Sequence, residues 1–124
     1  MKKIVIVDDE PDILFLASIM LRKAGYEVIE AANGEECLDK LKKEKPDLIL
    51  LDILGVDGCK ILDKIKKDER LKSIPIVMFT VVAEDYATRS LRCAGYSGYI
   101  TKPFSREEML GTIDKLFAIE TATA

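Results

Sequence analysis

The sequence predicts a single α/β domain with a doubly wound parallel sheet, and three observations support this prediction. Five short apolar segments alternate with five segments whose apolar residues recur at helical spacing. The segment Leu48–Leu51 is entirely aliphatic, which is typical of a strand covered by helices on both faces. Polar residues directly follow several of the strands. Because ligands of such sheets bind at the carboxyl ends of the strands, we expect the function to centre on Asp52.

The composition is that of an ordinary globular protein. The chain has 124 residues, enough for one domain with its own core, and 48% of them are hydrophobic. The formal net charge of −3 provides no basic surface for nucleic acid. No apolar run approaches the roughly 18 residues of a membrane span, and the first residues do not resemble a signal peptide. We therefore expect a cytoplasmic protein without direct nucleic-acid or membrane binding.

The cysteines and histidines exclude two classes of site. The chain has no histidine, and its three cysteines form no CxxC pair. A cysteine–histidine zinc site and catalysis by a nucleophile with a histidine base are therefore excluded within this chain. Cys37, Cys59 and Cys93 each fall inside a helical pattern, so we expect them to be small buried hydrophobic residues.

The first half of the chain is expected to contain three strands and two helices. Lys3–Val7 is a β-branched run, and the next segment begins with Pro11, which suits the first turn of a helix. Gly25 ends this helix and precedes a strand over Tyr26–Glu30. Asn33 then caps a second helix, with apolar residues on one face, before the Leu48 strand.

The second half continues the alternation. A third helix is expected over Asp57–Lys67, a strand over Ile76–Phe79, and a weaker helix over Ala83–Ala94. A short strand over Gly98–Thr101 precedes the last helix, whose start is marked by a capping box of Ser105 and Glu108 and by a staple of Phe104 on Met109. Residues 120–124 show no pattern, so we expect a domain over 1–119 and a frayed tail.

Several strands end in polar residues that suit phosphoryl chemistry. Asp8 and Asp9 follow the first strand, Asp52 the third, Thr80 the fourth and Lys102 the fifth. Each has an ordinary explanation alone, such as a helix cap or a solvated charge, but the set in this order is rarely obtained by chance. Three carboxylates without histidine favour a hard cation such as Mg²⁺. An aspartate can also accept a phosphoryl group as an acyl phosphate.

The whole chain resembles the receiver domains of two-component response regulators, in particular the single-domain chemotaxis regulators. A chemotaxis member of that family has a flavodoxin-like sheet of order 2-1-3-4-5, so the resemblance implies this order here. The matching segments are Val5-Ile6-Val7-Asp8-Asp9-Glu10, Leu50-Leu51-Asp52, Asp57-Gly58, Phe79-Thr80, Ala94-Gly95 and Gly98-Tyr99-Ile100-Thr101-Lys102-Pro103-Phe104.

The resemblance implies a role for each strand-end residue. Asp52 would be the phosphoacceptor, taking its phosphoryl group from a histidine kinase or phosphotransfer protein. Asp9 would ligate Mg²⁺ directly and Asp8 partly through water, with the backbone carbonyl of Leu54 and the Asp52 carboxylate completing the protein ligands. Thr80 would bind one phosphoryl oxygen.

The resemblance also implies a switch. Lys102 would pair with another phosphoryl oxygen, and the Lys102–Pro103 peptide bond would be cis. Tyr99 would move inward as Thr80 is drawn toward the phosphoryl group. The surface of the fourth helix, fifth strand and fifth helix would then change, and the output would be docking to another protein.

The chain departs from the family in two places. The loop after Asp52 reaches Gly58 in six residues where the family usually needs eight, so two residues are missing from the loop that supplies the metal-binding carbonyl. Residues two past the phosphoacceptor and two past the threonine are the aliphatic Leu54 and Val82, which in this family favours slow self-dephosphorylation. The alternative to a switch is therefore a receiver-like interaction module in which the short loop impairs phosphotransfer.

Two enzyme hypotheses are weaker. A flavodoxin-like electron carrier would need a Ser/Thr-rich phosphate loop after the first strand, which is absent from the sequence. A phosphatase of the haloacid dehalogenase type would need a second acid two residues after Asp52, where Leu54 stands. We therefore expect a phosphoacceptor and not an enzyme.

Overall fold

The computed structural model describes the backbone of residues 1–123 and the side chains of residues 1–119. Strands and helices alternate along this part of the chain, as the sequence predicted. The strands are β1 (Lys3–Val7), β2 (Glu27–Ala31), β3 (Leu48–Leu51), β4 (Ile76–Thr80) and β5 (Gly98–Thr101). The helices are α1 (Pro11–Lys23), α2 (Gly34–Lys43), α3 (Gly58–Lys66), α4 (Glu84–Arg89) and α5 (Arg106–Thr123).

The five strands form one parallel sheet in the order β2-β1-β3-β4-β5, which confirms the predicted topology. From β1 the chain first adds β2 on one side and then crosses back to place β3 on the other. Val7 and Leu51, the last residues of β1 and β3, are paired in register. The residues that follow these two strands are therefore neighbours at the same edge of the sheet.

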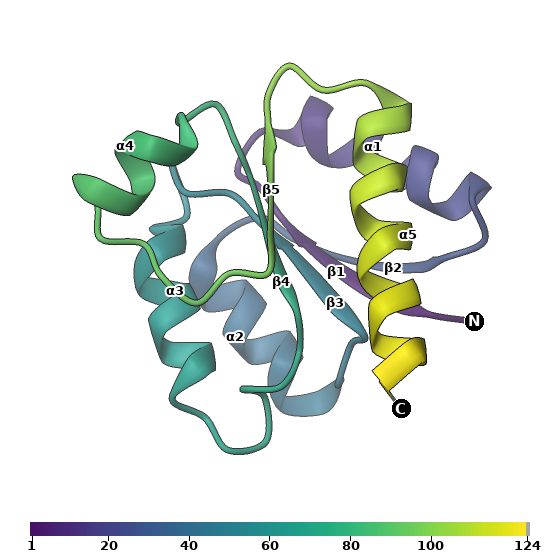
Figure 1. Cartoon of the computed structure of the whole chain (residues 1–124), viewed down its shortest axis with the longest axis horizontal. Helices are drawn as coiled ribbons and strands as arrows, with labels where there is room; N and C mark the ends of the chain where they lie inside the picture. The colour runs from purple at the N-terminus through teal and green to yellow at the C-terminus, as the bar shows by residue number, and fades with distance from the viewer. Residues whose placement is uncertain (124) are drawn as a thin grey trace.

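Helices cover both faces of the sheet, with α1 and α5 on one face and α2, α3 and α4 on the other (Figure 1). Side chains of β3 alternate between the two cores, because successive residues of a strand point to opposite faces. Ile49 and Leu51 pack in the core under α2 and α3, and Leu48 and Leu50 in the core under α1 and α5. All four are fully buried, so the aliphatic segment is a strand covered on both faces, as predicted.

The predicted starts of two helices are confirmed by side-chain caps. The Asn33 side chain accepts a hydrogen bond of 2.8 Å from the backbone N–H of Glu36 at the start of α2. The Ser105 hydroxyl accepts one of 3.0 Å from the backbone N–H of Glu108 at the start of α5. Each bond satisfies an N–H group that has no partner within its own helix, so the local sequence determines where these helices begin.

Helix α4 is shorter than the sequence predicted. The apolar pattern over Ala83–Ala94 indicated a helix of that length, but the regular helix ends at Arg89. Beyond it, Arg92 has a φ of 55°, and the backbone N–H of Cys93 donates to the carbonyl of Ala87 at 2.9 Å. This contact spans six residues, whereas an α-helix would use the carbonyl four residues back.

The prediction of buried cysteines is confirmed for Cys37 and Cys93 and wrong for Cys59, which is only partly buried, and the pairing of Cys59 with Cys93 was not predicted. Cys37 is a free, fully buried residue of α2, as expected. Cys59 and Cys93 instead form a disulfide between α3 and the segment after α4, with their Cα atoms 5.0 Å apart. They lie 34 residues apart in the sequence, and only the packing of α3 beside this segment brings them together.

Helix α5 continues to Thr123, so regular backbone extends into the segment 120–124 for which the sequence showed no pattern. The last residue of the expected tail, at position 124, lies outside the described residues, and its fraying stays a prediction. No helix in the described part of the chain has the length and apolarity needed to cross a membrane.

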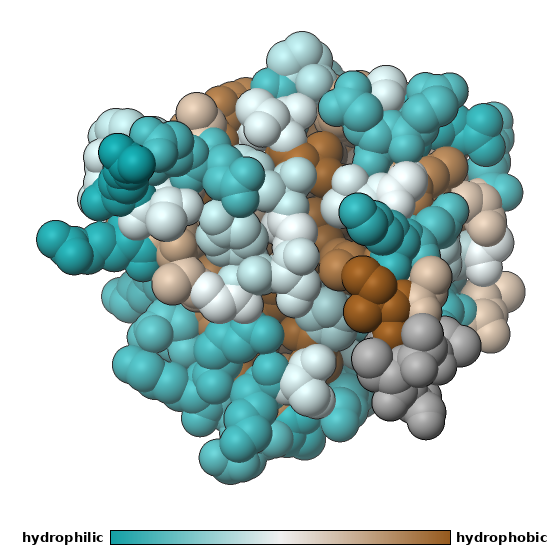
Figure 2. Space-filling view, in the orientation of Figure 1, coloured by the Kyte–Doolittle hydropathy of each residue, from teal (hydrophilic) through white to brown (hydrophobic). Residues whose placement is uncertain are grey.

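The face of the molecule in Figure 2 is mostly hydrophilic, with apolar residues visible mainly in strips between elements. The large apolar side chains that are exposed include Phe15 on α1, whose exposed fraction is 66%, whereas that of Phe79 on β4 is 0%. The two phenylalanines thus offer a matched pair for testing where the stability of the fold resides.

We predict that Phe79→Ala lowers the free energy of unfolding by about 3–5 kcal/mol, because it removes a buried ring and leaves a cavity. Phe79 also packs edge-on against Phe104, with ring centroids 4.8 Å apart. The matched change Phe15→Ala should cost less than about 1 kcal/mol. Urea unfolding of both variants measures the difference, and equal losses would contradict the assignment of the core.

Candidate functional site

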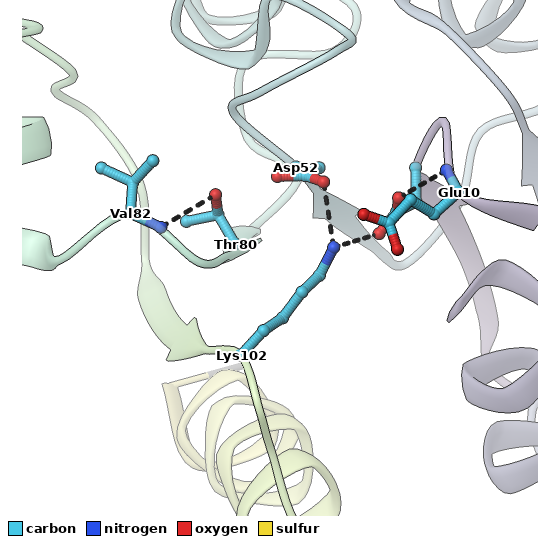
Figure 3. A network of polar contacts seen from close by, with 6 residues as sticks. Glu10, Asp52, Thr80, Val82 and Lys102 are labelled. Carbon is cyan, nitrogen blue, oxygen red and sulfur yellow. Dashed lines mark hydrogen bonds and ion pairs between the residues drawn. The ribbon is translucent and has the colours of Figure 1, made fainter. Parts of the chain in front are cut away.

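Four strand ends bring their polar residues to one edge of the sheet, as the sequence predicted. Asp8 follows β1, Asp52 follows β3, Thr80 ends β4 and Lys102 follows β5. Figure 3 shows the Lys102 side chain reaching from β5 toward Asp52, with Thr80 beside it. Asp8 and Thr80 are fully buried, and only 5% of Asp52 is exposed. The cluster is therefore largely shielded from bulk water.

The ammonium group of Lys102 lies between two of the carboxylates. Its Nζ is 2.5 Å from Oδ2 of Asp8 and 3.0 Å from Oδ2 of Asp52. It also lies 5.0 Å from the centre of the Phe79 ring. Burial on its own lowers the pKa of Lys102, but the hydrogen bonds and charges of the two aspartates more than offset this, and its pKa is raised. Lys102 is therefore a positive charge at neutral pH.

The three predicted acids form a cluster that fits a divalent cation. One carboxylate oxygen from each of Asp8, Asp9 and Asp52 lies within 4.8 Å of the others. Three carboxylates beside one ammonium leave a formal local charge of −2. Carboxylate oxygens are the ligands that Mg²⁺ uses in proteins, so the donor set and the charge both suit this ion.

Among the described residues, hydrogen bonding leaves one buried carboxylate oxygen of the cluster without a partner. Asp8 uses both of its oxygens, because Oδ2 contacts Lys102 and Oδ1 accepts a bond of 2.9 Å from the backbone N–H of Glu10. Oδ1 of Asp52 is buried and finds no hydrogen-bond partner among the described residues. An unsatisfied buried carboxylate oxygen is unfavourable unless a ligand reaches it, so Asp52 is the acid prepared to take one.

The loop after Asp52 is short but closed by ordinary backbone bonds. Its turn is held by a hydrogen bond of 3.0 Å from the N–H of Gly58 to the carbonyl of Ile53. A Cβ at position 58 would lie 2.0 Å from the carbonyl oxygen of Asp52, so only glycine allows this close approach. The loop therefore fits the chain to α3 despite the two missing residues.

Gly55 in the same loop lies directly against the Asp9 carboxylate of the acidic cluster. It has a φ of 79°, and a Cβ there would lie 2.1 Å from Oδ2 of Asp9. Gly55 was not singled out from the sequence. Its place in the short loop after Asp52 was the signal that could have identified it. The side chain of Leu54 is 51% exposed. The metal-ligating role of its carbonyl stays a prediction.

Thr80 and Tyr99 are linked through the backbone of one residue, Val82. The N–H of Val82 donates to the hydroxyl of Thr80 at 3.3 Å, and its carbonyl accepts from the hydroxyl of Tyr99 at 2.6 Å. Burial raises the pKa of Tyr99 to about 12, with smaller contributions from Tyr96, Glu84 and Asp52, so the phenol stays protonated and can donate. The two predicted switch residues are therefore mechanically connected.

The strand-end cluster, the cis peptide bond between Lys102 and Pro103, and the sheet order occur together in one known family. A family model described as the response regulator receiver domain matches residues 4–114. This chain belongs to that family. Its members are phosphoacceptor switches and not enzymes with turnover, as the sequence led us to expect.

Known proteins extend this match over the whole receiver domain. The chain is 34% identical to sporulation initiation phosphotransferase F of Bacillus subtilis, over 97% of each protein. It superposes with a TM-score of 0.88 on a response regulator receiver domain protein from Methanospirillum hungatei, at 31% identity, covering 100% of this chain and 99% of that one. For the response regulator TrrA of Thermotoga maritima, solved in complex with Mg²⁺ and BeF, the TM-score is 0.81 at 34% identity, covering 94% and 99%.

Other relatives are longer. The chain spans about half the length of several curated transcriptional regulators that it matches, between 45% and 50% of each. The activity and partners of a whole protein are therefore not taken from those relatives.

We predict that Gly55→Ala weakens Mg²⁺ binding by this receiver domain at least about tenfold, because the new methyl group displaces the Asp9 carboxylate. Gly111→Ala is the matched control, since a Cβ there meets nothing within 4 Å. Calorimetric titration with Mg²⁺ measures both variants. Unchanged affinity in Gly55→Ala would contradict a metal site that uses Asp9.

Proposed function

We propose that this receiver domain is a phosphorylation switch in which Asp52 accepts a phosphoryl group from the phosphohistidine of a histidine kinase or phosphotransfer protein. The observation that carries the proposal is the free Oδ1 of Asp52, buried beside two further acids and one lysine. The receiver domain is proposed to occupy residues 1–119. The absence of a membrane-spanning helix among the described residues is compatible with a cytoplasmic location, which we include in the proposal.

The proposed transfer is a substitution at phosphorus. An oxygen of the Asp52 carboxylate forms a P–O bond as the P–N bond of the phosphohistidine breaks, and the leaving imidazole takes a proton from solvent. Mg²⁺, when bound at the acidic cluster, neutralises charge on the phosphoryl oxygens. Asp8, Asp9 and the carboxylate of Asp52 would hold the ion, with the carbonyl of Leu54 as a further proposed ligand.

Two other residues would receive the phosphoryl oxygens. The ammonium of Lys102 already contacts Asp52 at 3.0 Å. It is therefore close enough to form an ion pair with an oxygen of a phosphoryl group on Asp52. The Thr80 hydroxyl accepts a bond from Val82 and keeps its own proton for donation. The Lys102 ammonium is already in place before transfer, which limits the reorganisation that electrostatic stabilisation would otherwise require.

The proposed switch runs through Val82. Movement of Thr80 toward a phosphoryl group on Asp52 would pull on the N–H of Val82, and the Val82 carbonyl holds the hydroxyl of Tyr99. The position of Tyr99 on β5 would change with it. The surface of α4, β5 and α5 is therefore the proposed docking face for a downstream protein, and it changes only if phosphorylation favours one of two conformations.

The alternative of an interaction module without phosphotransfer is less favoured. It rested on the short loop after Asp52. The three acids nevertheless lie within 4.8 Å of one another, and the loop closes onto them through Gly55 and Gly58. The assembled cluster thus supports the switch.

We predict that acetyl phosphate with Mg²⁺ adds one phosphoryl group to the protein, measured by intact-mass spectrometry. The modification should be absent in Asp52→Asn, because the amide is not a nucleophile, and should fall when Mg²⁺ is chelated. Asp57→Asn is the matched control in the same loop, at an exposed position. A modified Asp52→Asn protein would overturn the assignment, and an unmodified wild-type protein would favour the interaction module.

We predict that the phosphoryl group is lost slowly, because Leu54 and Val82 offer no polar group to orient an attacking water. Leu54→Gln should accelerate the loss about tenfold or more by positioning that water. Leu16→Gln, an exposed leucine on α1, serves as the control. The decay of the phosphorylated mass after removal of acetyl phosphate gives the rate. Equal rates in wild type and Leu54→Gln would contradict this account.

A further inference from the structure

The disulfide between Cys59 and Cys93 joins two elements near the phosphorylation site. Cys59 belongs to the first turn of α3, one residue after Gly58, whose backbone lies against the carbonyl of Asp52. Cys93 lies in the irregular segment between α4 and β5. The Cα separation of 5.0 Å falls within the usual range for bonded cysteines. The crosslink therefore connects the loop after Asp52 to the segment after α4.

We propose that Cys59 and Cys93 form a reversible thiol–disulfide exchange site and that its oxidation shortens α4. The co-reactant is a small-molecule disulfide of the glutathione type. This inference goes beyond the proposed phosphorylation switch and depends on it only where α4 serves as part of a docking surface.

The two cysteines differ in their exposure to solvent, and this difference indicates which of them reacts first. Cys59 is partly exposed, whereas only 1% of Cys93 is exposed. Cys59 is therefore the cysteine that reacts with the small molecule, and Cys93 the one that closes the bond.

The exchange balances in two steps. The Cys59 thiolate attacks the small disulfide, which forms a mixed disulfide and releases one small thiol. The Cys93 thiolate then attacks the sulfur of Cys59, which forms the crosslink and releases the second small thiol. The protein loses two electrons and two protons, and the small disulfide gains both as it becomes two thiols.

The third cysteine provides an internal contrast. Cys37 is fully buried in the core beside α2, and burial raises the pKa of its thiol to about 12. It is therefore protonated at neutral pH and has no access to a small disulfide. The proposed site is confined to the Cys59–Cys93 pair.

The crosslink accounts for the early end of α4. The sequence pattern favours helix up to Ala94, but in the oxidised protein the Cys93 N–H bonds the carbonyl of Ala87, and Arg92 has a left-handed φ. Holding Cys93 against α3 prevents residues 91–94 from continuing the helix. Once the bond is reduced, we expect this segment to extend α4, since its local sequence favours that form.

The change would reach the proposed switch surface through Tyr96. Its hydroxyl contacts Thr88 at 3.0 Å and Glu84 at 2.9 Å, and its ring packs edge-on against Tyr99 with centroids 5.5 Å apart. Tyr96 thus lies between α4 and the switch residue, three positions after Cys93. Oxidation would set the shape of the same surface that phosphorylation is proposed to alter.

The first test measures the redox site. The chain of 124 residues is equilibrated in buffers of increasing ratio of reduced to oxidised glutathione, alkylated and analysed by mass spectrometry with peptide mapping. We expect the crosslink to disappear in one transition, after which Cys59 is alkylated in the folded protein, whereas Cys93 and Cys37 are alkylated only after denaturation. Alkylation of the pair at every ratio, or a crosslink in the folded protein that resists reduction at every ratio, would overturn the proposal.

Two variants control this test. Cys37→Ser should leave the transition unchanged, and Cys59→Ser should abolish the crosslink. A crosslink that persists in Cys59→Ser, or one lost in Cys37→Ser, would show that the wrong pair has been assigned.

The second test measures the length of α4 in the oxidised and reduced protein. Amide hydrogen exchange within residues 91–94 should slow about tenfold on reduction, because these amides gain the regular helical partners four residues back. The double variant Cys59→Ser/Cys93→Ser should exchange slowly under both conditions. Identical exchange rates in oxidised and reduced wild-type protein would overturn the proposal that the disulfide shortens α4. Neither test requires phosphorylation, so loss of the proposed phosphoacceptor function would leave these results interpretable on their own.

Discussion

The contact of Lys102 with Asp8 and Asp52 is the interaction on which the site depends. Two almost fully buried carboxylates next to one another are unfavourable, because each raises the electrostatic cost of the other. One ammonium group placed between them offsets part of that cost and ties the ends of β1, β3 and β5 together. The negative charge that remains on the three acids suits a divalent cation, and such a cation would offset the charge of an anionic ligand at the same place. The net negative charge of the cluster therefore favours the binding of a positively charged ligand.

The parallel sheet makes this arrangement possible. Because β1 and β3 are neighbours in the same direction, the residues that follow them meet at one edge. The aliphatic residues of β3 are buried on both faces, so the strand has little freedom to move and Asp52 is held at a fixed position. A rigid core therefore positions the acid, while the short loop of glycines beside it supplies the close backbone approach that the cluster requires.

The elements around the cluster are connected rather than independent. Val82 links Thr80 to Tyr99 through its two backbone groups. The disulfide links the start of α3 to the segment that follows α4. Both connections lead to α4 and β5. A change at Asp52, or at the two cysteines, is therefore proposed to alter the surface on this side of the molecule.

The sequence alone determined the alternation of strands and helices, the caps at Asn33 and Ser105, and the acids at the strand ends. These features depend on residues close together in the chain, whose propensities and periodicity act locally. The sheet order and the residue roles came from resemblance to a family. The tertiary structure alone decided the Cys59–Cys93 bond, the early end of α4 and the contact of Gly55 with Asp9. Each of these joins parts of the chain that become neighbours only when the helices pack on the sheet, and no local pattern encodes that distance.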